Sequence, residues 1–143
     1  MYHYRKTRKT YEHHNRSNKT GACPFPLCNV ADTLQPILFE NSTMYVIPNR
    51  VSYDLFEGRE VLDHVMIIPK RHIESMKDFT KSEKVDAMTI AGEYEARGYN
   101  VYARGVGAIT RSVRHQHTHL IKLTSRKPKA YFFLTKPHFL WKI

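Results

Sequence analysis

The stretch RHQHTHLIKL places three histidines, His115, His117 and His119, at strict two-residue spacing. Alternate side chains of a β-strand point to one face, so we expect the three imidazoles to share one side of a strand. The outer two α-carbons would lie roughly 13 Å apart, too far for one zinc ion to bind all three rings. The row suits phosphate chemistry, because one neutral imidazole attacks phosphorus while its neighbours donate hydrogen bonds to the oxygens. The alternative is a chance run of histidines.

The segments around the histidines predict an α+β fold, a mostly antiparallel sheet of about five strands with one main helix. Apolar or alternating runs predict strands at PILFE (36–40), TMYVIP (43–48), VLDHVMIIP (61–69), YNVYA (99–103), SVRHQHTHLIKL (112–123) and AYFFL (130–134). Residues 80–98 predict the helix, because Thr80 and Glu83 form a capping box and Gly98 suits the C-terminal stop. We expect its apolar face to carry Val85, Met88, Ala91 and Tyr94.

The net charge of +10 is concentrated at the two ends of the chain. Residues 1–22 hold six Lys/Arg and one acid, and residues 122–143 hold six Lys/Arg and no acid. Residues 23–121 are nearly neutral, with eleven basic and twelve acidic residues. We therefore expect a flexible basic tail over 1–22 and one folded domain over 23–143. The basic ends are either solvated charge or an attraction for a polyanion such as nucleic acid.

Several protein classes are excluded by composition. No apolar run reaches the length of a membrane-spanning helix, so we expect no contact with a membrane. The charged N-terminus is not followed by an apolar stretch, which argues against a secretory signal and makes a cytoplasmic location the default. Cys23 and Cys28 are too few for a disulfide scaffold and indicate reduced thiols or a metal site.

The stretch HQHTHLI resembles the signature of the histidine-triad (HIT) superfamily of nucleotide hydrolases and transferases. Upstream, DHVMIIPKRHIESM resembles the second hallmark of that family, and TMYVIPN is similar to its early strand. The resemblance covers most of residues 23–125, with the two motifs in the family's order on either side of the helix. Gln116 and Thr118 replace hydrophobic residues of the pattern, and LFEGREVLD lengthens the loop before His64, which indicates a divergent branch.

The resemblance assigns roles to residues around the triad. His117, the middle histidine, is the implied nucleophile, and its central place in the row agrees because a phosphate lying across the row meets it first. A backbone carbonyl such as that of His115 would hold the proton on its other ring nitrogen. His119 is the implied donor to the phosphate or leaving group. Ser112 matches a position that faces the leaving group; the alternative is an ordinary strand serine.

Four further residues are candidates for substrate binding. Asn49 matches the position that contacts the nucleotide ribose, or else it only holds its own turn. His64 matches a position near the active site, or else it is a satisfied strand histidine. Arg104 and Arg111 replace an asparagine and a glutamine of the family pattern. Arginine binds phosphate in a bidentate manner, so both could hold the substrate phosphates; the alternative is surface charge.

Branches of the superfamily bind a structural zinc ion, and the matching positions here form a tetrahedral set of Cys23, Cys28, His72 and His115. The Cys-x4-Cys spacing departs from the tighter Cys-x2-Cys of those branches. The alternative is two reduced, half-buried cysteines. With zinc bound, His115 orients the site while His117 attacks and His119 donates, which accounts for three imidazoles in one row.

The resemblance implies an enzyme that cleaves a nucleoside phosphate derivative at the α-phosphate through a nucleotidyl-histidine, acting on a small nucleotide. It also implies a homodimer as one arrangement, since dimers are common in the family. Two other functions stay open: removal of adenylate from nucleic acid, as in the aprataxin branch, and a zinc-stabilised nucleotide- or nucleic-acid-binding module without activity. The near-neutral body favours the small nucleotide, because no basic stripe or base-stacking platform accompanies the triad.

Overall fold

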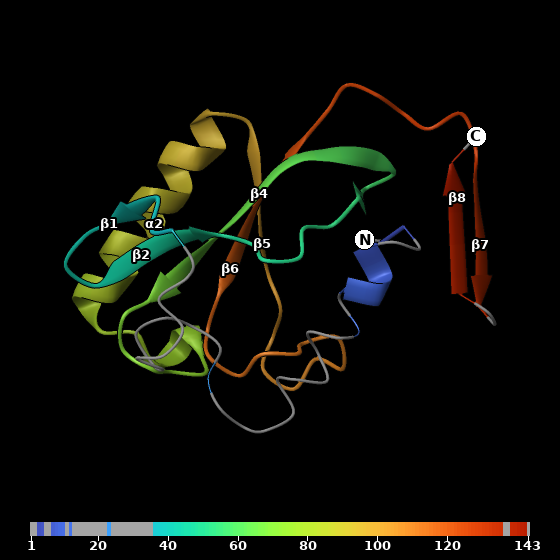
Figure 1. Ribbon diagram of the computed structural model, residues 1–143. Coiled ribbons are helices and arrows are strands. Elements are labelled where there is room, and N and C mark those ends of the chain that lie inside the picture. Colours follow the sequence, from blue (N-terminus) through green and yellow to red (C-terminus); the bar gives the residue numbers. More distant parts are fainter. Residues whose placement is uncertain are drawn as a thin grey trace.

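The computed structural model describes residues 3–4, 7–10, 12, 23, 36–135 and 138–142, with side chains described as far as residue 130. Its centre is a six-stranded antiparallel sheet with one long helix, α2 (Lys81–Ala96), against it (Figure 1). The strands lie in the order β1-β2-β4-β6-β5, and β3 pairs with β4. Their bounds are β1 (Phe39–Glu40), β2 (Met44–Pro48), β3 (Leu55–Phe56), β4 (Arg59–Pro69), β5 (Tyr99–Ala103) and β6 (Thr118–Leu123). The predicted α+β fold is confirmed.

Strand β6, which carries the last histidine of the row, lies between β4 and β5. His119 is opposite Met66 of β4 and Tyr102 of β5. Two residues nearer the start of β4, His64 is opposite Ile121. Because side chains alternate along a strand, His64 of β4 and His119 of β6 project from the same face of the sheet.

The prediction of a strand over residues 112–123 is wrong in its first half, because β6 begins only at Thr118. Pairing with β4 stops there, close to Pro69, which has no N–H to donate to a further ladder bond. The preceding segment is held differently, by a hydrogen bond of 2.7 Å from the Gln116 N–H to the Ile73 carbonyl. His115 and His117 therefore lie in an extended loop that leads into the strand.

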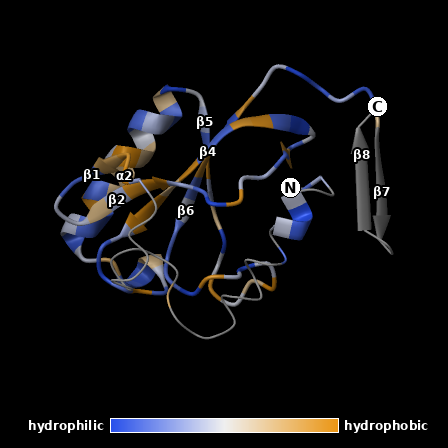
Figure 2. Cartoon of the chain, viewed as in Figure 1, coloured by the Kyte–Doolittle hydropathy of each residue, from blue (hydrophilic) through white to orange (hydrophobic). Residues whose placement is uncertain are grey.

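The two faces of the sheet have different contents. The face under α2 is a hydrophobic core, and Figure 2 shows hydrophobic residues where the helix meets the sheet; its buried members are Met44, Val46, Val65, Ile67, Ile90, Ala91, Tyr94, Tyr99 and Leu120. The opposite face carries smaller apolar clusters, among them Tyr45, Ile47, Met66 and Ile68. His64 and His119 belong to this second face, away from the helix, so the helix side can stay apolar while the other side carries the polar groups.

Helix α2 has the predicted capping box. Thr80 Oγ1 accepts from the Glu83 N–H at 3.2 Å, and Glu83 Oε2 accepts from the Thr80 N–H at 2.7 Å. The predicted apolar face is partly wrong, since Val85 and Met88 are 59% and 72% exposed. Arg71 Nε and Nη2 donate to the two Glu83 carboxylate oxygens, which fixes the rotation of the helix. The residues that turn inward are Glu83, Ile90, Ala91 and Tyr94.

Short elements complete the described chain. The single 3-10 turn η2 (Met76–Asp78) precedes α2. The predicted strand at 130–134 is observed as β7 (Tyr131–Thr135), which pairs with an additional strand, β8 (His138–Lys142), in a separate two-stranded sheet (Figure 1). Among the helices of the described residues, none combines the length and the apolar character needed to cross a bilayer.

Candidate active site

The middle histidine of the row has its proton fixed by the backbone. His117 Nδ1 lies 2.8 Å from the carbonyl oxygen of His115, which can only accept a hydrogen bond. Nδ1 therefore carries the proton and Nε2 carries the lone pair, as a nucleophilic imidazole requires. Burial lowers the pKa of His117, and the positive charges of Arg111 and Arg104 act in the same direction, so the ring is neutral at pH 7.

His64 and His119 form a buried pair on the same face of the sheet. His64 Nε2 lies 2.9 Å from His119 Nδ1, and each side chain is only 4% exposed. Burial lowers the pKa of His64 to about 3 and that of His119 to about 2. The ring of His119 stands edge-on to that of His117, with centroids 5.0 Å apart. Its Nε2 atom is buried and has no hydrogen-bond partner within the described residues.

Asn49 lies directly after β2 and contacts His64 twice. Its backbone N–H donates to the His64 carbonyl at 2.8 Å, and its Nδ2 lies 3.0 Å from His64 Nε2. Its Oδ1 accepts from the Val51 N–H at 3.2 Å, so it also holds its own turn. The structure thus places Asn49 beside the histidine pair, and its contact with a ribose stays a prediction.

Arg104 follows β5 and reaches across to the loop before β3. Its Nη2 donates to the Tyr53 hydroxyl at 2.8 Å, and its Nη1 donates to the Thr110 carbonyl. Its charge contributes to lowering the pKa of His64, of His117 and of His119, so the guanidinium acts on all three rings. This positive field would favour a phosphate at the triad.

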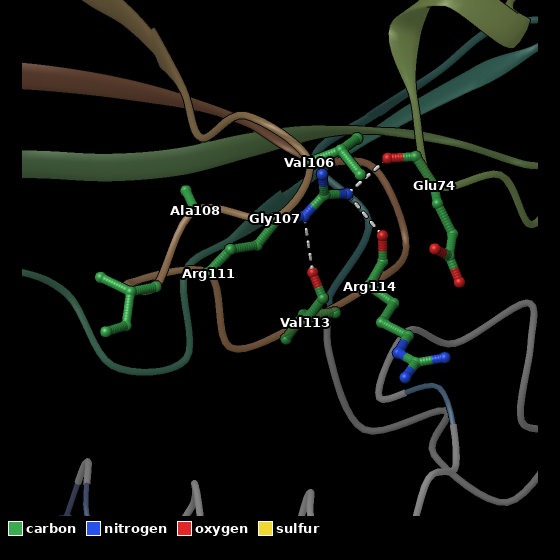
Figure 3. Close-up of a pocket in the computed structure, with 8 residues that line it drawn as sticks. Glu74, Val106, Gly107, Ala108, Arg111, Val113 and Arg114 are labelled. Carbon is green, nitrogen blue, oxygen red and sulfur yellow. Dashed lines mark hydrogen bonds between the residues drawn. The ribbon is translucent and has the colours of Figure 1, made fainter.

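Arg111 organises the loop before the triad. Its Nε donates to the Val113 carbonyl at 3.1 Å, and its Nη2 donates to the carbonyls of Glu74 at 2.6 Å and Arg114 at 2.5 Å (Figure 3). The loop borders a cavity of about 520 Å³, lined by Glu74, Val106, Gly107, Ala108, Ile109, Arg111, Val113 and Arg114. Ser112 is exposed in this loop. The roles of Arg111 and Ser112 towards a substrate stay predictions.

Cys23, His72 and His115 form a cluster that could hold a metal ion. One ligand atom from each lies within 4.8 Å of the others, and Cys23 Sγ is 3.2 Å from His115 Nδ1. His115 Nε2 lies 2.9 Å from the Pro69 carbonyl, which places its proton on Nε2 and its lone pair on Nδ1, facing the sulfur. Tetrahedral zinc separates its ligands by about 3.3 to 3.8 Å, so a small contraction would suffice. Cys28, the fourth predicted ligand, lies outside the described residues.

Tyr53 and Asp54 are two neighbours of the site that the sequence did not indicate. The Tyr53 ring is 5% exposed, and its centroid is 4.5 Å from that of His64. Asp54 accepts from the Tyr4 N–H at 2.8 Å and from Thr7 Oγ1 at 3.1 Å, so part of the predicted tail contacts this loop. The stretch NRVSYDLFEGRE has no periodic pattern, and no signal in it separates a buried tyrosine from an exposed one.

Residues 60–126, which include both hallmark motifs and all three histidines of the row, match the family model of the HIT domain. The chain is a HIT-domain protein. Solved structures with this fold include a "Hit Like Protein" (17% identity, 66% of this chain and 92% of that chain covered, TM-score 0.52). Two others are HIT family hydrolases from Clostridium thermocellum (24% identity, 70% and 89% covered, TM-score 0.51) and Legionella pneumophila (20% identity, 75% and 96% covered, TM-score 0.50).

These identities establish the shared fold of the HIT domain. No curated protein sequence matches the chain. The matched range contains eight of the predicted site residues, namely His64, His72, Arg104, Arg111, Ser112, His115, His117 and His119. Asn49, Cys23 and Cys28 precede it.

Proposed function

We propose that this HIT-domain protein is a nucleotide hydrolase or transferase that cleaves a nucleoside phosphate derivative at the α-phosphorus. The observation that carries the proposal is the hydrogen bond between His117 Nδ1 and the His115 carbonyl. It leaves the Nε2 lone pair as the nucleophile of a neutral ring, 5.0 Å by centroids from a second neutral imidazole. The family match and the structural neighbours described as HIT family hydrolases support it.

The first step forms a bond between His117 Nε2 and the α-phosphorus and breaks the bond between that phosphorus and the leaving group. His119 Nε2, the buried nitrogen without a protein partner, donates its proton to the departing atom. In the second step water or another acceptor attacks phosphorus and the N–P bond breaks. The acceptor's proton returns to His119, which restores both rings. Arg104 supplies positive charge beside the phosphate throughout.

Zinc is the metal that the Cys and His ligands favour, held by Cys23, His72 and His115 with Cys28 as the fourth ligand. When bound, it would supply a rigid structural link. The carbonyl of His115 orients His117, so fixing the backbone at this position also fixes the direction of the nucleophile.

The substrate we favour is a small nucleotide, with Asn49 beside the ribose. Removal of adenylate from nucleic acid is the second candidate, and the six basic residues of segment 1–22 are the observation in its favour. A binding module without activity is the remaining outcome. Nucleoside phosphoramidates, dinucleoside polyphosphates and adenylated DNA, tested side by side on purified protein, distinguish the three.

The decisive test is His117→Gln on the best substrate of that screen. We expect turnover to be lost and a nucleotidyl adduct, seen by mass spectrometry after an acid-free quench, to disappear from the peptide that contains residue 117. His13→Gln, a change of the same type in the N-terminal segment, serves as the control and should keep both. An adduct on another residue, or a His117→Gln protein that turns over normally, would remove His117 from its role.

A further inference from the structure

Tyr53 makes three separate contacts with the site, and the proposed chemistry uses none of them. Its backbone N–H lies 3.3 Å from His64 Nδ1. Its ring packs against two of the histidines, with centroids 4.5 Å from His64 and 5.6 Å from His119. Its hydroxyl accepts from Arg104 at 2.8 Å. The residue comes from the stretch between β2 and β4, where this chain is longer than the family pattern.

The backbone contact decides where His64 carries its proton. An N–H can only donate, so His64 Nδ1 must accept from Tyr53 and therefore has no proton of its own. In the neutral ring the proton is then on Nε2. The opposite tautomer would point two protons at each other in a buried site and leave the Tyr53 N–H without an acceptor.

The Asn49 side chain agrees with this tautomer. Its Oδ1 accepts from the Val51 N–H, so the amide nitrogen must be the atom that faces His64. That nitrogen lies 3.3 Å from Nδ1 and 3.0 Å from Nε2. Both atoms of the second contact carry protons, so only the first is a hydrogen bond, and it again requires Nδ1 to accept.

The choice passes on to the third histidine of the row. His64 Nε2–H faces His119 Nδ1 at 2.9 Å, so Nδ1 of His119 accepts and its proton must be on Nε2. This is the buried atom that has no partner within the described residues. A single backbone N–H, two rings away, thus leaves a proton on the atom that faces the reaction.

We infer that Tyr53 is a positioning residue, whose backbone N–H sets the tautomers of His64 and His119 so that His119 presents Nε2–H to the leaving group. The ring and hydroxyl of Tyr53 hold the loop in place by packing on the pair and binding Arg104. The inference rests on the proposed function only for what receives the proton; the tautomers are a property of the protein without substrate.

The tautomers can be read directly by NMR of protein labelled with 15N in its histidines, since protonated and unprotonated ring nitrogens give separate signals. At pH 8 we expect His64 and His119 to carry the proton on Nε2 and His117 to carry it on Nδ1. A His64 ring protonated on Nδ1 would overturn the inference at once. This measurement needs no substrate, so it stands even if every nucleotide tested is inert.

An amide-to-ester replacement at Tyr53, made with the matching hydroxy acid, removes the N–H and keeps the side chain. We expect a mixture of His64 and His119 tautomers, a kcat about ten-fold lower and a KM changed less than about two-fold. The same replacement at Thr43, whose N–H donates to Asn41 Oδ1 in a turn at another part of the sheet, is the matched control and should change neither. Tautomers that are unchanged in the Tyr53 ester would show that Tyr53 does not set them.

Tyr53→Phe separates the backbone from the side chain, because it removes only the hydroxyl that accepts from Arg104. The N–H remains, so we expect the wild-type tautomers in this variant. A change of the His64 tautomer in Tyr53→Phe would assign the control to the side chain and overturn the inference.

Discussion

Acidification should destabilise this fold, because two buried histidines are neutral in the folded chain. Burial lowers the pKa of His64 to about 3 and of His119 to about 2, against 6.5 in the unfolded chain. The unfolded chain therefore binds more protons than the folded one below pH 6.5, so stability falls as the pH falls through that value. Above pH 7.5 both states are neutral at these positions, and the effect vanishes.

The size of the loss follows from the same values. Between pH 7.5 and 5.5 the unfolded chain gains nearly one proton per histidine, which corresponds to about 1.4 kcal/mol for each ring and about 3 kcal/mol for the pair. Stabilities of single domains are about 5 to 15 kcal/mol, so this loss is a large share. The folded pKa values lie well below the window, so the size of the loss hardly depends on them.

Urea unfolding at pH 7.5 and 5.5 measures the difference directly. His64→Gln should reduce the pH-dependent loss by about 1.4 kcal/mol, since one titrating group has gone. His13→Gln, in the predicted tail, should leave the loss as in wild type. A free energy of unfolding that is the same at both pH values would refute the neutral, buried state of the pair.

Three other changes test separate parts of the structure. Cys23→Ser should lower the zinc content measured by elemental analysis from about one ion per chain and lower the melting temperature with it; zinc-free protein that melts at the same temperature would contradict a structural metal. Thr80→Ala should cost about 1 kcal/mol in urea unfolding through loss of the helix cap, and Thr89→Ala, on the exposed side of α2, should cost less. Neutralising Arg16 and Lys19 should leave turnover of a small nucleotide unchanged, whereas an adenylated-DNA substrate would lose salt dependence by up to about 0.9 per phosphate contact.

The fold could be predicted from local pattern because the strands and the helix carry strong signals. The apolar run from Val65 to Ile68 and the capping box at Thr80 each depend on a few neighbouring residues, and both were correct. The rotation of α2 could not be predicted in the same way. It depends on Glu83, a carboxylate that turns inward because Arg71, from a distant loop, binds both of its oxygens. Helical periodicity alone favoured the exposed Val85 and Met88 instead.

The site divides along the same line. Histidine spacing and the family resemblance identify which rings meet, and the structure does bring His64 beside His119 and Cys23 beside His115. The protonation of each ring, however, is decided by backbone groups that have no sequence signature. The Pro69 and His115 carbonyls fix the protons of two histidines in the row, and the Tyr53 N–H fixes the third through His64. A substitution that moves one of these backbone groups could therefore stop the chemistry while every histidine stays in place.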